Sequence, residues 1–160
     1  MRRLCITLLC GLVAVPAAMA AARATGDGTL ELTNVSGTAS ITGSRGTLWG
    51  QMARGKLIVT DFVAGDGAVL VSGAEYRRPI NENVTIYGGS GLHFRVTGGR
   101  YKLRLQQGIG INIAAVGVGS AYLIADPLVD DPGDYAIDGG KPVAMPLSGR
   151  TVYFGLAPTP

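Results

Sequence analysis

Residues 92–105 read LHFRVTGGRYKLRL, and this stretch decides the fold class. Apolar and polar side chains alternate on both sides of Gly98-Gly99, which is the two-residue period of a half-buried β-strand. Two glycines suit a tight turn, because glycine accepts a positive φ at no steric cost. The stretch therefore predicts a β-hairpin over residues 92–106, with one buried and one exposed face.

The same alternation recurs along most of the chain after residue 24, in short runs separated by glycine, serine or asparagine. Glycine accounts for 25 of the 160 residues, charged residues for 16% and hydrophobic residues for 47%. This balance excludes a disordered chain and a coiled coil. We expect an all-β, single-domain protein. It would be an antiparallel barrel or sandwich, with a small β-solenoid as the alternative.

The first twenty residues have a different character. The basic pair Arg2-Arg3 is followed by an apolar run from Leu4 to Val15 and then by small residues around Ala20. This is the layout of a secretory signal peptide. We expect residues 1–20 to be cleaved, with a cut as late as residue 24 as the alternative.

Both cysteines, Cys5 and Cys10, lie in this N-terminal segment. The expected mature domain, residues 21–160, therefore has no cysteine nucleophile, thiolate metal site or disulfide. It also has no apolar run long enough for a transmembrane helix. We expect an exported protein, in a periplasm or outside the cell.

The exposed face of the predicted hairpin is basic. Its members are His93, Arg95, Arg100, Lys102 and Arg104, and no acid stands among them. Like charges placed opposite each other destabilise a strand pair, so something should offset them. Acids from elsewhere, solvation of the long basic side chains in water, or a bound anion would do so. The acids that could do so are Glu31, Asp61, Glu75, Glu82 and the aspartates of the C-terminal part.

The alternative to internal neutralisation is an anion-binding face. Arginine suits this role because its planar fork donates two parallel hydrogen bonds to a phosphate or carboxylate. For an exported protein, the partners would be anionic envelope polymers or lipid head groups. No specific nucleic acid is expected, because no run of exposed aromatic residues accompanies the basic ones to stack on bases.

The segment 126–134 forms an acidic loop before a predicted C-terminal hairpin at 135–155. Clustered carboxylates can bind calcium, and here the ligands would be Asp126, Asp130, Asp131 and Asp134. The spacing does not match an EF-hand, and aspartates next to Pro127 and Pro132 fit a surface turn equally well. Asp138-Gly139 predicts the turn of the following hairpin.

No catalytic residue or cofactor is expected. A serine triad would have to use His93, the only histidine, and the chain has no G-x-S-x-G motif. We therefore expect a non-enzymatic protein that binds an anionic partner through its basic face. Two alternatives remain: a lipocalin-like carrier of apolar ligands, and a structural or self-assembling envelope protein.

The motif F-R-x-x-G-G-R-Y-x-x-R, which spans residues 94–104, resembles the core of small exported bacterial all-β proteins of unknown function. The glycine-rich apolar runs at 108–111 and 116–119 and the later hairpin extend the resemblance. The resemblance implies an exported all-β protein, and it supplies no activity, substrate or site residues.

Overall fold

A computed structural model describes residues 24–155, and the predicted signal peptide lies outside the described residues. The described chain forms one antiparallel sheet of eight strands and no helix. The strands are β1 (Gly28–Asp61), β2 (Gly67–Ser72), β3 (Tyr76–Pro79), β4 (Val84–Gly98), β5 (Tyr101–Ala125), β6 (Asp134–Ile137), β7 (Val143–Ala144) and β8 (Arg150–Phe154).

Most of the fold is one long two-stranded ribbon. Its tip is the turn at residues 80–83, where the Ile80 amide donates to the Val84 carbonyl at 2.8 Å. From this tip, β3 and β2 pair with β4, and β1 then pairs with β5 from Asp61 and Tyr101 down to Gly37 and Ala125. The ribbon is therefore a continuous antiparallel hairpin that runs through most of the chain.

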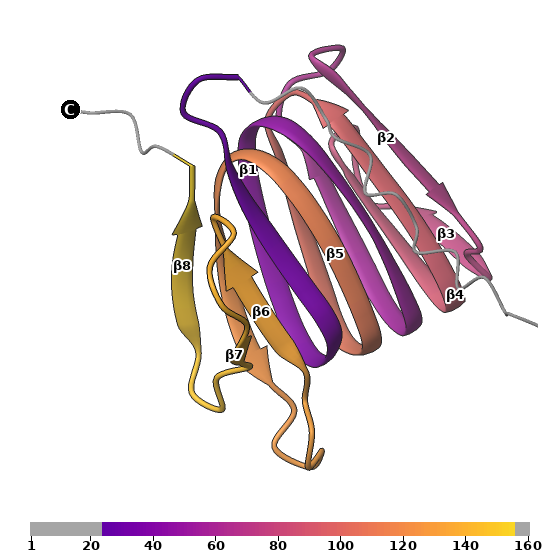
Figure 1. Ribbon diagram of the computed structural model, residues 1–160. Coiled ribbons are helices and arrows are strands. Elements are labelled where there is room, and N and C mark those ends of the chain that lie inside the picture. Colours follow the sequence, from indigo (N-terminus) through magenta and orange to yellow (C-terminus); the bar gives the residue numbers. More distant parts are fainter. Residues whose placement is uncertain (1–23, 156–160) are drawn as a thin grey trace, which may run out of the picture.

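This ribbon is wound into a flattened coil, so that each turn pairs with the next (Figure 1). Leu30 and Leu48, which are 18 positions apart, pair with Ala115 from its two sides. Leu57 likewise lies between Leu105 on β5 and Tyr87 on β4. In Figure 1 the turns stand side by side, with β8 at one end and β2 and β3 at the other.

Glycines allow the sharp corners of the coil. Gly46 has a φ of +113°, and a Cβ on it would lie 2.0 Å from the Val116 carbonyl oxygen of the partner strand in the same ribbon. At the opposite corner Gly55 has a φ of +144°, and its Cβ would lie 2.9 Å from the Gly108 Cα. Only glycine combines this backbone conformation with such a close approach between chains. The high glycine content is therefore largely a property of the corners.

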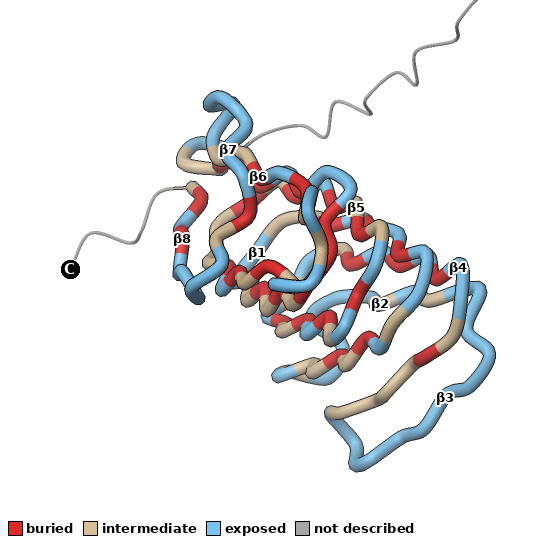
Figure 2. Tube along the Cα trace, turned by 90° about the horizontal axis from the view of Figure 1, so that it is seen from below, coloured by how far each residue is buried: buried red, intermediate tan, exposed pale blue. Residues whose placement is uncertain are grey.

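The coil has two walls that share one hydrophobic core. We call one the Trp49 wall, formed by β2, β6 and residues 28–33, 47–53, 92–97 and 109–117. The other, the basic wall, is formed by β3, β8 and residues 38–43, 56–61, 84–88, 101–106 and 119–125. Buried and exposed positions alternate along the strands of both walls (Figure 2).

The inward side chains of both walls pack into one cluster. Leu48 and Phe94 enter it from the Trp49 wall, and Leu57 and Leu105 enter it from the basic wall. The space is filled closely: a Cβ on Gly50 would lie 2.5 Å from the Phe94 ring. The all-β, single-domain, antiparallel fold class is therefore confirmed in a sandwich-like form. The sheet is not closed, since β2 and β8 end its strand order.

The predicted hairpin at 92–106 is wrong. β4 and β5 do not pair with each other, because β1 lies between them and pairs with both. Gly98 and Gly99, with φ near +70°, turn a corner of the coil instead of closing a hairpin. The predicted sorting of side chains nevertheless agrees with the burial, because alternation within a strand does not depend on which strand is its partner.

The C-terminal part covers one end of the coil. β6 pairs with both β1 and β7, and Asp138 and Gly139 form the turn after β6 with positive φ values. β8 leaves this hairpin and pairs with β5. The predicted unit at 135–155 is thus a short hairpin followed by a separate edge strand.

Candidate functional site: a basic wall and a tryptophan groove

The five residues of the predicted anion site lie in three places. Lys102 and Arg104 stand on the basic wall, next to Thr60 and Ile58 of β1. His93 and Arg95 stand on the Trp49 wall, next to Gln51 and Trp49. Arg100 lies at the corner between β4 and β5. The coil therefore separates the cations that a hairpin would have placed together.

Two further cations join Lys102 and Arg104 on the basic wall. Lys56 points outward from β1 beside Gln106. Residues that stand opposite each other on successive strands form a row across the wall. The row that contains Arg104 continues through Ile58 and Ile86 to Arg78 on β3. Sequence reasoning missed both residues. Lys56 could have been found as the outward start of the alternating run at 56–60, whereas the place of Arg78 depends on the coil.

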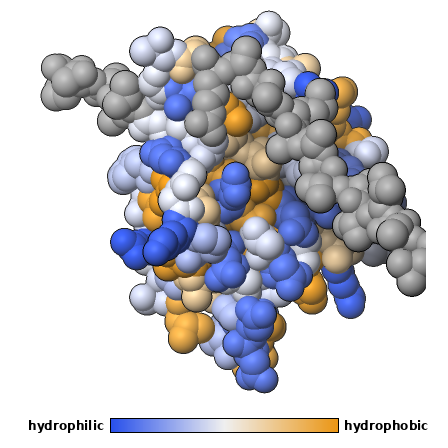
Figure 3. Space-filling model, in the orientation of Figure 1, coloured by the Kyte–Doolittle hydropathy of each residue, from blue (hydrophilic) through white to orange (hydrophobic). Residues whose placement is uncertain are grey.

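No acid stands at the outward positions of these rows. The row of Arg104 contains Arg78, Ile86, Ile58, Ser40, Tyr122 and Thr151, and the row of Lys102 contains Val84, Thr60, Thr42, Ser120 and Tyr153. Figure 3, in the orientation of Figure 1, shows hydrophilic and hydrophobic side chains interleaved on one face of the molecule.

Among the described residues, the acids expected to neutralise the cations form no ion pair with them. Glu31 lies on the Trp49 wall, and an Asp61 carboxylate oxygen accepts the Val63 amide at 3.2 Å. Within residues 24–155, the one ion pair joins Arg45 to Asp27 at 3.1 Å. The cations of the basic wall therefore have no ion-pair partner in the described part of the chain.

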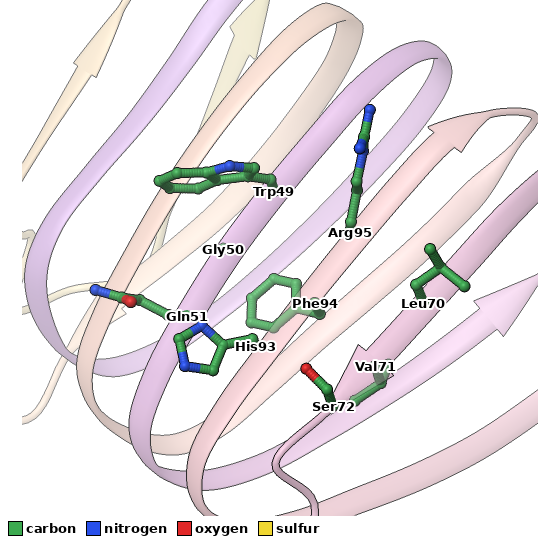
Figure 4. A pocket seen from close by; sticks show the side chains of 9 residues that line it. All are labelled: Trp49, Gly50, Gln51, Leu70, Val71, Ser72, His93, Phe94 and Arg95. Carbon is green, nitrogen blue, oxygen red and sulfur yellow. The ribbon is translucent and has the colours of Figure 1, made fainter. Parts of the chain in front are cut away.

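His93 and Arg95 line a surface pocket of about 530 Å³ on the Trp49 wall (Figure 4). Its lining comes from three adjacent strands: Trp49, Gly50 and Gln51 of β1, His93, Phe94 and Arg95 of β4, and Leu70, Val71 and Ser72 of β2. Trp49 is the only tryptophan and is 53% exposed. We call this pocket the tryptophan groove.

The Arg100 main chain holds a corner of the coil. Its amide donates to an Asp66 carboxylate oxygen at 3.0 Å, and its carbonyl accepts the Phe62 amide at 3.2 Å. These bonds attach the turn between β1 and β2 to the start of β5. Arg100 contributes to architecture through its backbone, while its exposed side chain belongs to neither wall.

The acidic loop uses its aspartates as turn caps. Asp126 accepts the Leu128 amide at 3.0 Å, and Asp131 accepts the Gly133 amide at 3.2 Å, as the surface-turn alternative expects. Asp130 is exposed and Asp134 is the first residue of β6. Among the described residues, no three His, Cys, Asp or Glu side chains form a group that could hold a metal ion. Calcium binding remains a prediction without geometric support.

A second small pocket lies at the corner between β3 and β4, lined by Arg54, Gly55, Glu75, Gly89 and Ser90. Glu75 accepts hydrogen bonds from the Ser90 hydroxyl and from the Ser90 amide, the latter at 3.0 Å. The bonds from Ser90, helped by the positive charge of Arg54, lower the pKa of Glu75 below its ordinary value of 4.5. The carboxylate therefore fastens the outermost turn of the coil to β4.

Replacing Glu75 with glutamine should loosen this corner. A neutral amide oxygen is a weaker acceptor than a carboxylate, so protection of the Ser90 amide against hydrogen exchange should fall several-fold at neutral pH. Because the folded pKa is lowered, the contribution of Glu75 is present above the ordinary pKa of 4.5 and is lost as the pH falls through the folded value. The variant should lack this acid-dependent loss. Equal protection and equal pH dependence in parent and variant would contradict the assignment, and Glu82→Gln serves as the control.

The comparisons with known proteins add no identification. No protein-family model matches the chain, and no curated protein or solved structure matches it. The resemblance to small exported bacterial proteins therefore remains a prediction. In the described region, no helix has the length and apolar character needed to cross a membrane.

Proposed function

We propose that this protein is an exported, non-enzymatic β protein of the cell envelope or extracellular space that binds an anionic polymer through its basic wall. The observation that carries the proposal is the group Lys56, Lys102 and Arg104, which face outward on adjacent strands with no acid in their rows. Unpaired cations held close together repel each other, and a bound polyanion relieves that repulsion.

The spacing of the cations favours a polymer over a small anion. Lys102 and Arg104 are two residues apart on one strand, about 7 Å, and Lys56 lies diagonally across from Arg104 at a similar distance. Arg78 lies three strands from Arg104 in the same row, about 14 Å away. One phosphate or carboxylate cannot reach all four cations, whereas a chain of anions can contact them in succession.

The rigid surface supports the same conclusion. The backbone of paired strands is held at fixed positions, so binding orders only the Lys and Arg side chains and not the main chain that carries them. Ile58, Thr60 and Ser40 lie between the cations and project only a short distance. A flat surface of this kind suits contact with an extended polymer better than insertion into a bilayer. Binding to lipid head groups is therefore tested in parallel with binding to polymers.

The lipocalin-like alternative has less support, because the shared core fills the space between the two walls.

Self-assembly is favoured by one specific observation. β2 forms an open edge of the sheet and carries no charged residue, whereas β3 beside it has Arg77, Arg78 and Pro79, which protect an edge from further pairing. Sedimentation over a wide concentration range tests this candidate, and a monomer throughout would remove it.

The double substitution Lys102→Gln, Arg104→Gln should weaken binding to polyphosphate and to polygalacturonate. Each cation that contacts the polymer contributes roughly one unit to the slope of log affinity against log salt, so the slope should fall by about two. Affinity at low salt should fall at least tenfold. Titration calorimetry over a salt series measures both quantities, and phosphatidylglycerol vesicles are tested in parallel.

The matched control is Arg95→Gln, Lys141→Gln, which removes the same charge away from the basic wall. Arg95 stands on the Trp49 wall, and Lys141 follows β6, which pairs at the end of that wall. The control should bind like the parent. Equal losses in both variants would show a dependence on net charge alone and would overturn the proposal, as would binding of vesicles but of neither polymer.

A further inference from the structure

The tryptophan groove lies on the wall opposite the basic one, and the proposed function does not use it. Two outward rows border it, Leu70–Arg95–Trp49 and Ser72–His93–Gln51, and the row of the buried Phe94 runs between them (Figure 4). From these rows we infer that the groove binds a sugar ring of an oligosaccharide, with Trp49 as the stacking surface. This inference stands independently of the proposed function.

The exposure of Trp49 is the first support. A tryptophan on a strand is stabilised mainly by burying its large apolar face, yet Trp49 remains 53% exposed. Leu70, which lies two strands away on the other side of Arg95, is 65% exposed. Large exposed apolar side chains that line one surface pocket together with a few polar groups are typical of ligand-binding sites. The groove has this composition in a volume of about 530 Å³, which is large enough for a small ligand.

The polar rim of the groove supplies hydrogen-bond partners for the hydroxyl groups of a sugar. Gln51 provides a carbonyl acceptor and an amide donor, Ser72 a hydroxyl, and His93 ring nitrogens, so the rim offers both donors and acceptors. A pyranose ring presents an apolar C–H face and a periphery of hydroxyls. An indole face beside such mixed groups is complementary to both parts of the ring.

The charge of the Trp49 wall argues against a nucleic acid as the occupant. Arg95 is its one Lys or Arg at an outward position, and Glu31 and Asp134 stand in the outward rows of the same wall. Nucleic-acid binding draws most of its affinity from cations on phosphates, and stacking on single strands uses several aromatic residues in succession. A weakly charged wall with one tryptophan fits an uncharged sugar ring better.

The groove is built on rigid elements. Its three strands are hydrogen-bonded neighbours, with Trp49 opposite Arg95 and Arg95 opposite Leu70. The backbone therefore fixes the spacing between the stacking surface and the polar groups before any ligand arrives. Such preorganisation lowers the entropic cost of binding.

Because the chain has a single tryptophan, its fluorescence reports directly on the groove. The experiment titrates the full protein with tetrasaccharides of glucose and of N-acetylglucosamine. We expect at least one of them to give a saturable shift of the emission towards shorter wavelength. Gln51→Ala, which retains the fluorophore, should weaken that binding about tenfold.

Calorimetry with the same tetrasaccharides tests Trp49 itself. Trp49→Ala should abolish measurable binding, while Tyr153→Ala, which removes an exposed aromatic from the basic wall, should leave it unchanged. Lys102→Gln, Arg104→Gln should also leave sugar binding unchanged, so failure of the proposed function and failure of this inference are distinguishable. No response to any tetrasaccharide, binding that survives Trp49→Ala, or a response to single-stranded oligonucleotides instead would overturn the inference.

Discussion

Replacing Gly46 with alanine is expected to lower the free energy of unfolding by on the order of 4 kcal/mol. Gly46 has a φ of +113°, and the new Cβ would lie 2.0 Å from the Val116 oxygen and 2.7 Å from the Gly117 Cα. Both contacts are with backbone, so no side chain can move aside. The corner would have to open, and the pairing of β1 with β5 within the ribbon would be disturbed. Urea unfolding followed by circular dichroism measures the loss.

Gly65→Ala is the matched control. Gly65 also has a positive φ, +85°, but a Cβ on it would meet nothing within 4 Å. This substitution should therefore cost only the backbone strain, about 1 kcal/mol. The difference between the two variants isolates the close approach of the two strands of the ribbon at this corner. Equal losses would mean that β1 and β5 do not approach each other this closely at Gly46.

Replacing Leu105 with alanine is expected to cost about 4 kcal/mol of stability. Leu105 is completely buried and lies between Leu57 on one side and Ala39 on the other, so it contacts two successive turns of the coil. The cavity would form in a core bounded by paired strands, which can collapse only slightly. Thermal and urea unfolding should both show the loss.

The neighbouring substitution Gln106→Ala provides the control for Leu105. Gln106 points outward and is half-buried on the basic wall, so its replacement should change stability by no more than about 0.5 kcal/mol. Similar losses at positions 105 and 106 would contradict the inward and outward assignment. They would also remove the basis for placing Lys102 and Arg104 on the outer surface.

Alternation along the chain was enough to predict which side chains are buried. Phe94, Val96, Leu103 and Leu105 are inside, and Arg95 and Arg104 are outside, as the period of two requires. The partner of each strand was not predictable in the same way. A Gly-Gly pair is compatible with a tight hairpin and also with a corner, and local sequence does not distinguish between the two.

This difference explains the partial prediction of the candidate sites. Lys102 and Arg104 stay together because they are two positions apart on one strand. Lys56 joins them through the pairing of β1 with β5 within the ribbon, and Arg78 joins them through the pairing of β1 with β4 between turns. Both kinds of pairing connect residues far apart in sequence. Trp49 becomes the neighbour of Arg95 for the same reason, and no local pattern links those two positions.

The sequence by itself determined the all-β class, the inward and outward faces and the absence of cysteine from residues 24–155. Each of these follows from composition or from a period of two, which are local properties. Only the tertiary structure decided that the ribbon coils, that the cations divide between two walls and that Trp49 borders a groove. Those features depend on hydrogen bonds between successive turns. The register of that pairing is set by corners at which only glycine fits.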